Sequence, residues 1–73
     1  MGDDRLRGAY DVSILSATEA LVLEAFARAQ TRREIANLLR LSPRTVGRAL
    51  TTAKEKLGAR SPAEAAIIYE LAR

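Results

Sequence analysis

The chain has 73 residues, which is the size of one small domain and leaves no room for a second catalytic lobe. It contains no cysteine and no histidine. This composition excludes disulfides, zinc fingers, iron–sulfur clusters and every mechanism that needs a Cys or His side chain. Ala, Leu, Arg and Glu are abundant and only three residues are aromatic, so the expected fold class is all-α, with no cofactor and no metal.

The twelve basic and nine acidic side chains are unevenly distributed. Residues 1–27 carry two basic and five acidic side chains and residues 61–73 carry one and two, whereas residues 28–60 carry nine basic against two acidic. A basic segment of this kind is typical of proteins that bind polyanions, although Arg and Lys lie on the surface of most folds. No apolar run is long enough for a membrane span or a secretion signal, so we expect a cytoplasmic protein without a membrane partner.

Residues 1–14 show no sustained 3.6-residue period and contain Gly2 and Gly8. We therefore predict a flexible lead-in or linker remnant over residues 1–14 and a single domain over residues 15–73. The apolar side chains of Tyr10, Val12 and Ile14 are the parts of the lead-in that can pack onto this domain.

Four helix starts follow along the chain. Three are capping boxes, in which a Ser or Thr oxygen accepts from the amide three residues on and a Glu side chain accepts from the cap amide. The three pairs are Ser16 with Glu19, Thr31 with Glu34, and Ser61 with Glu64. The fourth start is Ser42 before Pro43, whose helix ends at Gly58. The predicted fold is therefore a four-helix domain, with helices over about 17–29, 32–39, 43–57 and 62–72.

One apolar stripe on each helix predicts the core. The stripes are Thr18, Val22, Ala25, Phe26 and Ala29; Ile35, Leu38 and Leu39; Val46, Leu50, Ala53 and Leu57; and Ala65, Ile68, Tyr69 and Ala72. The last helix also has a second apolar face, formed by Ile67 and Leu71 and roughly 120–160° away from the first. This second face belongs either to the intramolecular core or to a dimer interface, and the sequence leaves both open.

The second and third helices have the outline of a helix-turn-helix unit. A short capped helix is followed by the three-residue turn Arg40-Leu41-Ser42 and a longer helix with a polar outer face. Ala36 on the first of the two lets the second cross close by. A plain four-helix bundle with a polar surface is the alternative to this interpretation.

The polar side of the third helix carries the candidate contacts to DNA bases, which are Arg44, Gly47, Arg48 and Thr51. A guanidinium group such as that of Arg48 can bond guanine O6 and N7 together, and a threonine methyl can touch a thymine methyl. Gly47 has no side chain, which either permits close approach of the backbone or only weakens the helix.

The candidate contacts to DNA phosphates lie mostly at the starts of these two helices, where amides, hydroxyls and the positive dipole end suit phosphate oxygens. They are Thr31, Arg32, Arg33, Ser42, Thr45 and Lys54. Lys56 is a further candidate, with a solvated surface position as the equal alternative for both lysines. Glu55 lies late in the helix, where a carboxylate repels phosphate least.

From Leu15 to Ala66 the chain resembles the LuxR/GerE-type helix-turn-helix domain of bacterial transcription regulators. The residues that match the family pattern are Leu15-Ser16 with Glu19, Val22-Leu23, Glu34-Ile35-Ala36, Leu39, Ser42, Thr45-Val46, Lys56-Leu57-Gly58, and Arg60 with Glu64-Ala65. The resemblance implies a third helix that reads the major groove, and a fourth helix, here with Ile67 and Leu71, that pairs two copies. It also implies a place behind a receiver or ligand-binding domain, as in response regulators.

The chain departs from the family pattern at four positions. Thr18 stands where the family usually has Arg, Ala29 where it usually has Gly, and Gly47 and Ala49 where it often has Lys and His. Two habitual DNA contacts are therefore missing. Either Arg48 replaces what Gly47 lacks, with a changed base preference, or the affinity for DNA is lower.

We expect a sequence-specific DNA-binding domain that acts as a homodimer on double-stranded DNA, with RNA polymerase as a further partner. One alternative is a sigma-factor region 4 domain, which the chain also resembles from Arg44 to Lys56, although Arg40 stands where that family usually has Gly. A second is a protein-interaction module that uses the face of Ile67 and Leu71. We expect no enzyme, because no pair of carboxylates is placed for acid–base catalysis.

Overall fold

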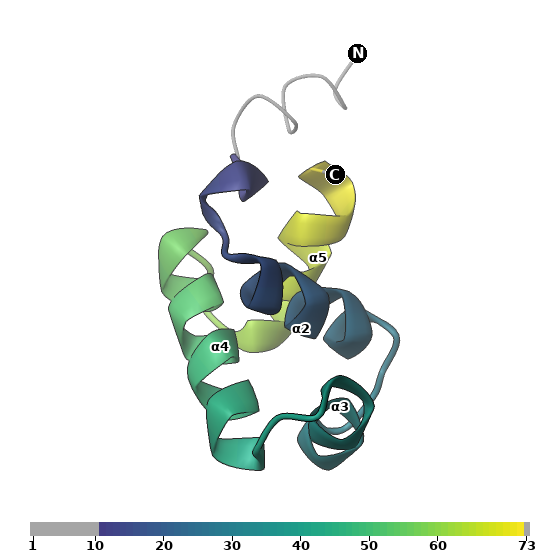
Figure 1. Cartoon of the computed structure of the whole chain (residues 1–73). Coiled ribbons are helices and arrows are strands. Elements are labelled where there is room, and N and C mark those ends of the chain that lie inside the picture. The colour runs from purple at the N-terminus through teal and green to yellow at the C-terminus, as the bar shows by residue number, and fades with distance from the viewer. Residues whose placement is uncertain (1–10, 73) are drawn as a thin grey trace.

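The structure is a computed structural model that describes residues 11–72. These residues form a short 3-10 turn and four α-helices, without a β-strand among them (Figure 1). The elements are η1 (Val12–Ile14), α2 (Ala17–Ala27), α3 (Arg32–Leu39), α4 (Pro43–Lys56) and α5 (Pro62–Ala72). The all-α, four-helix fold predicted from the sequence is confirmed. Within the described residues, no helix has the length and apolar character needed to cross a membrane.

The helices begin where the caps predict. The amide of Ser16 donates to the Glu19 carboxylate at 2.9 Å, and the amide of Glu19 donates to Ser16 Oγ at 3.1 Å. The reciprocal pair at Thr31 and Glu34 has distances of 2.7 and 3.1 Å. These bonds satisfy amides that have no partner inside a helix.

The third predicted capping box forms only in part. The amide of Glu64 donates to Ser61 Oγ at 3.1 Å, as expected. The Glu64 carboxylate, however, accepts from the amide of Arg60 at 2.9 Å, one residue before the cap. The prediction of a reciprocal bond to Ser61 is therefore wrong, although the helix still begins at Pro62.

Each of α2, α3 and α4 is followed, within two residues of its last residue, by a residue whose backbone lies in the left-handed region. The φ angles are +63° at Ala29, +57° at Arg40 and +66° at Gly58. Beyond α4, the amides of Gly58 and Ala59 donate to the carbonyls of Glu55 and Lys54, which is the Schellman arrangement. Ala29 adopts this backbone form although it is not a glycine. Because a left-handed residue cannot continue a right-handed helix, α2 ends at Ala27 and not at residue 29.

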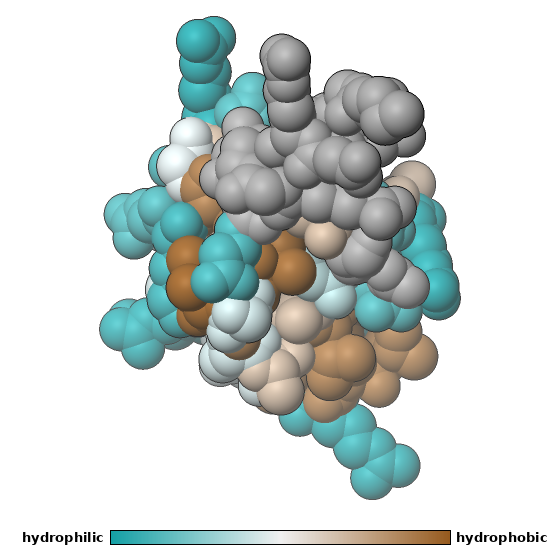
Figure 2. Space-filling view, turned by 90° about the horizontal axis from the view of Figure 1, so that it is seen from above, coloured by the Kyte–Doolittle hydropathy of each residue, from teal (hydrophilic) through white to brown (hydrophobic). Residues whose placement is uncertain are grey.

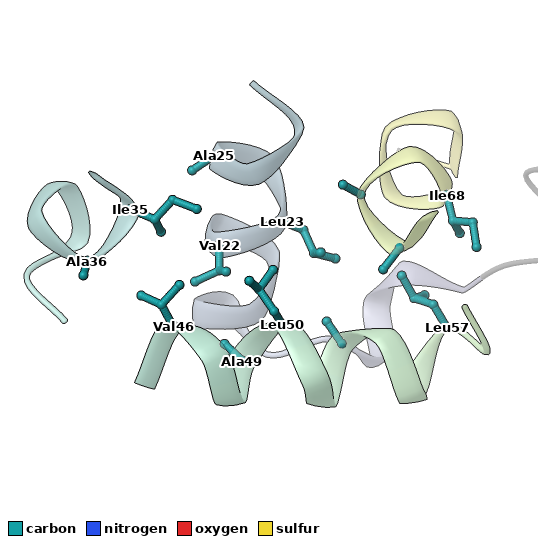
Figure 3. Packing of buried hydrophobic residues seen from close by; sticks show 13 residues of the cluster. Val22, Leu23, Ala25, Ile35, Ala36, Val46, Ala49, Leu50, Leu57 and Ile68 are labelled. Carbon is teal, nitrogen blue, oxygen red and sulfur yellow. The ribbon is translucent and has the colours of Figure 1, made fainter. Parts of the chain in front are cut away.

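Helix α2 lies at the centre of the fold, with α3 on one side, α5 on the other and α4 running beneath all three (Figure 3). Val22 of α2 points toward Val46 and Leu50 of α4, while Leu23 of α2 points toward α5, and all four residues are fully buried (Figure 3). On α3, Ile35 points toward α2, while the small Ala36 faces α4 (Figure 3). The predicted stripe of α4 is confirmed, since Val46, Leu50, Ala53 and Leu57 are all buried.

Three residues predicted for the core lie elsewhere. Thr18, Ala29 and Leu38 are exposed, Leu38 at 62%, whereas Leu23 is fully buried and was not on any predicted stripe. The cause is the central position of α2, which is covered on two flanks, so its buried arc is wider than a single stripe and extends to Leu23.

Five large hydrophobic side chains of the described residues remain exposed. They are Ile14, Leu21, Leu38, Ile67 and Leu71. Figure 2 shows such hydrophobic residues at the surface as separate brown patches between hydrophilic ones. Val12 of the predicted lead-in packs against the core and Ile14 is 47% exposed, while Tyr10 lies outside the described residues.

Candidate nucleic-acid interface

Helix α3 and the beginning of α4 form one end of the molecule, opposite the ends of η1 and α5 (Figure 1). The turn between them is residues 40–42, as predicted. Its geometry rests on Arg40, whose left-handed backbone lets the amide of Leu41 reach the carbonyl of Ala36 at 2.8 Å. The buried Ala36 allows the two helices to cross closely, which is the arrangement of a helix-turn-helix unit.

The face of α4 opposite the core carries the predicted base contacts. Arg44, Arg48 and Thr51 are exposed and Gly47 is partly exposed, while Val46 and Leu50 on the inner side are fully buried. The inner stripe thus fixes the rotation of α4 about its axis, and this rotation directs the arginines to solvent. The polar side of α4 therefore faces solvent and does not pack against the other helices.

A shallow polar hollow lies on this outer surface. It is lined by Arg32, Arg44, Gly47, Arg48, Thr51 and Thr52. The hollow therefore brings together all four predicted base contacts and one predicted phosphate contact, Arg32, which comes from the start of α3. Thr52 was not predicted, because it lies beside the core stripe. Its place four residues after Arg48 was the one signal for it.

The cations of the hollow have no carboxylate partners within residues 11–72. The ion pairs found there lie elsewhere, between Arg28 and Glu24 at 3.3 Å and between Lys56 and Glu19 at 2.8 Å. Arg32, Arg44 and Arg48 thus present three guanidinium groups to solvent around one hollow. Such a cluster attracts anionic groups and offers forked hydrogen-bond donors.

The starts of α3 and α4 keep free donors beside this hollow. The capping box satisfies the amides of Thr31 and Glu34, which leaves the amides of Arg32 and Arg33 without an intrahelical partner. At α4 the amide of Thr45 donates to Ser42 Oγ at 3.1 Å, and the two hydroxyls bond each other at 2.9 Å. Thr31, Arg33, Ser42 and Thr45 are exposed, and Lys54 is partly exposed, outside the hollow.

Gly47 has no structural reason to be glycine. Its φ is not in the left-handed region, and a Cβ added there would meet no heavy atom within 4 Å. The missing side chain therefore leaves open space in the outer surface of α4, between the arginines of the hollow.

Lys56 forms a structural contact between two helices of the domain. Its Nζ donates to the Glu19 carboxylate at 2.8 Å and to the carbonyl of Ile14 at 3.3 Å, so it ties the end of α4 to the start of α2. Burial raises the pKa of the Glu19 carboxyl, but the hydrogen bonds from Lys56 and from the amide of Ser16 outweigh burial and lower that pKa overall.

A second, apolar groove lies away from the basic surface, between the end of α2 and the outer face of α5. Its lining residues are Phe26, Ala27, Ala29, Ala63, Ala66, Ile67, Glu70 and Leu71. Ile67 and Leu71 are 60% and 51% exposed, so the second apolar face of α5 is not part of the intramolecular core.

The comparisons with known proteins agree with this geometry. The family model of the bacterial regulatory proteins of the luxR family, named GerE, matches residues 13–69, which is most of the chain. Searches of the curated proteins and of the solved structures gave no match. The match includes the whole of α2, α3 and α4 and extends into α5, which packs on α2. The chain belongs to the luxR family of bacterial regulatory proteins, and it carries the DNA-binding helix-turn-helix domain of these transcription regulators.

Proposed function

We propose that this domain binds double-stranded DNA sequence-specifically by inserting the outer face of α4 into the major groove. Arg44, Gly47, Arg48 and Thr51 face the base edges in this arrangement. The observation that carries the proposal is the hollow, where arginines without carboxylate partners among residues 11–72 surround the outer face of a helix whose inner face is buried in the core. A forked guanidinium group matches guanine O6 and N7 better than any other base edge.

The phosphate contacts come from the starts of α3 and α4. Thr31, Arg32 and Arg33 lie at the start of α3, and Ser42 and Thr45 lie at the start of α4, where amides, hydroxyls and the positive end of the helix dipole suit phosphate oxygens. Lys54 adds a cation farther along α4. These contacts fix the register of the domain on DNA without reading its sequence.

Two copies pair through α5 when they bind DNA, with Ile67 and Leu71 at the contact. The support is the apolar groove beside these side chains, which a second copy of the same face can fill. Two domains paired in this way read half-sites about one helical turn apart. Contact with RNA polymerase, and the boundary between a lead-in over residues 1–14 and a domain over residues 15–73, remain predictions.

A salt series tests the proposed function. Fluorescence anisotropy on a mixed-sequence duplex measures the affinity at rising salt concentration, and each phosphate neutralised contributes about 0.9 to the slope of log affinity against log salt. Each copy offers three cationic phosphate contacts, Arg32, Arg33 and Lys54, so two copies neutralise about six phosphates and we expect a slope of about −5. A protein-interaction module that uses only the apolar face of α5 would bind no duplex at any salt concentration, and this result would reject the proposal.

A further inference from the structure

Arg32 and Arg33 are adjacent arginines at the start of α3, but the structure separates their surroundings. Arg32 lines the hollow on the outer face of α4, together with Arg44 and Arg48. Arg33 is exposed and does not line it. Arg32 is the only residue of the described chain outside α4 that borders this hollow.

The space between Arg32 and the other two arginines exists because residue 47 is glycine. A Cβ at this position would meet no heavy atom within 4 Å, so neither packing nor backbone geometry demands glycine. Any longer side chain would project from α4 into the region that Arg32 borders. The absence of that side chain lets a group from a partner approach the α4 backbone with Arg32 beside it.

Three guanidinium groups around one hollow repel one another and have no carboxylate partner within residues 11–72. A ligand that relieves this repulsion must offer several acceptors to donors from two helices. Arg44 and Arg48 are about one turn apart on α4, about 6 Å along its axis, which exceeds the rise of about 3.4 Å per base pair, so they can contact different base pairs. Arg32 reaches the same surface from the side, across the position of Gly47.

We infer that Arg32, which the proposed function counts among the phosphate contacts, instead reads a guanine edge in the major groove through the gap at Gly47, and that Thr31 and Arg33 alone make the phosphate contacts at the start of α3. This inference rests on the proposed function, because it places a third reading residue in the same site. The absence of a side chain at Gly47 and the presence of Arg32 on α3 thus have one combined effect. Arg32 contacts the base that a longer side chain at residue 47 would otherwise contact.

The test uses a duplex selected from a random pool by the whole chain, in which each guanine is replaced in turn by 7-deazaguanine. This analogue keeps Watson–Crick pairing but lacks the N7 acceptor that a forked arginine needs. The wild-type chain loses roughly tenfold or more in affinity at each guanine that an arginine reads. The Arg32→Ala variant is insensitive to the replacement at one of these guanines, and it keeps the others.

Arg33→Ala is the matched control, since it removes the same charge from the same helix start. It weakens binding to every duplex by the same factor, lowers the salt slope by about 0.9, and retains the wild-type pattern of sensitive guanines. Arg32→Lys keeps the charge but not the fork, so it loses the same guanine as Arg32→Ala. Gly47→Gln fills the gap, and in that background Arg32→Ala changes the pattern no further.

The opposite result is equally definite. If Arg32→Ala and Arg33→Ala both weaken all duplexes uniformly, and Arg32→Lys restores binding, then Arg32 is a phosphate contact and the inference is wrong while the proposed function stands. If the wild-type chain selects no duplex at all, the proposed function itself fails. Circular dichroism of each variant, compared with the wild type, separates loss of reading from loss of fold.

Discussion

The outer faces of α4 and α5 differ in the partner that their chemistry can accept. Both helices bury one face in the same core, through Leu50 on α4 and Ile68 on α5. On the solvent side, α4 presents arginines around a polar hollow, while α5 presents Ile67 and Leu71 beside an apolar groove. Cations that have no ion pair within the described residues suit a polyanion, and exposed apolar side chains suit a second protein surface. One small domain thus separates DNA reading from pairing by using two helices.

The largest expected effect comes from breaking the core that holds both faces. Leu50→Ala removes a fully buried side chain at the contact between α4 and α2, and it should lower the free energy of unfolding by about 2–5 kcal/mol. Urea denaturation followed by circular dichroism measures this loss. Leu38→Ala is the matched control, because Leu38 is 62% exposed and its truncation should change stability little. Equal effects of the two substitutions would contradict the assigned core.

The next largest effect concerns the face of α4 alone. Arg48→Ala should weaken binding to a selected duplex by about 1–3 kcal/mol and relax the preference at one base pair, because a forked contact to guanine is lost. The thermal unfolding curve should stay unchanged, since Arg48 is exposed. Arg60→Ala, which removes an exposed arginine outside the hollow, is the control. A loss of equal size on all duplexes would make Arg48 a phosphate contact.

A smaller effect is expected on the face of α5. Ile67→Asp should leave the monomer folded but weaken binding to a duplex with two half-sites by on the order of 1–2 kcal/mol. The reason is that the exposed part of Ile67, 60% of the residue, would no longer bury apolar surface against a second copy. Binding to a single half-site should not change, and anisotropy on the two duplexes measures the difference. Ile14→Asp, at another exposed isoleucine, serves as control. An unchanged affinity and Hill slope on both duplexes would remove pairing through α5.

The smallest effect tests a contact that belongs to neither outer face. The folded-state pKa of Glu19 is lowered, so its ionised form stabilises the fold above the ordinary glutamate range, and this contribution is lost as the pH falls through the folded-state pKa. Unfolding measured between about pH 7 and pH 3 should therefore depend less on pH in Glu19→Gln than in the wild type. An identical pH dependence in both proteins would mean that the ionised Glu19 carboxylate, with its bonds from Lys56 and Ser16, contributes no stability.

The parts of the fold that depend on local chemistry were predictable from the sequence. The helix starts after Ser16, Thr31 and Ser42 follow from the hydroxyl groups of these residues, each of which accepts a hydrogen bond from the amide three residues later. The end of α4 follows from Gly58, which adopts a left-handed backbone. The inner face of α4 follows from its period, which also determines the outer face. The four base candidates are therefore together on one surface.

The parts that depend on how helices dock were not predictable. Leu23 is buried because α5 covers a second flank of α2, and no period within α2 reveals that cover. Leu38 is exposed because the short α3 packs through Ile35, Ala36 and the partly buried Leu39. Arg32 reaches the hollow only because of the crossing of α3 and α4, so the sequence could not separate it from Arg33.

The central claim is that the outer face of α4 contacts DNA. Its most direct test is a titration of the isotope-labelled chain with a selected duplex, followed by the backbone amide signals in nuclear magnetic resonance spectra. We predict that the largest shifts occur at residues 44–52 and at the start of α3, with small shifts in the buried part of α2. Shifts concentrated on α2 and α5, with the signals of residues 44–52 unmoved, would contradict the claim.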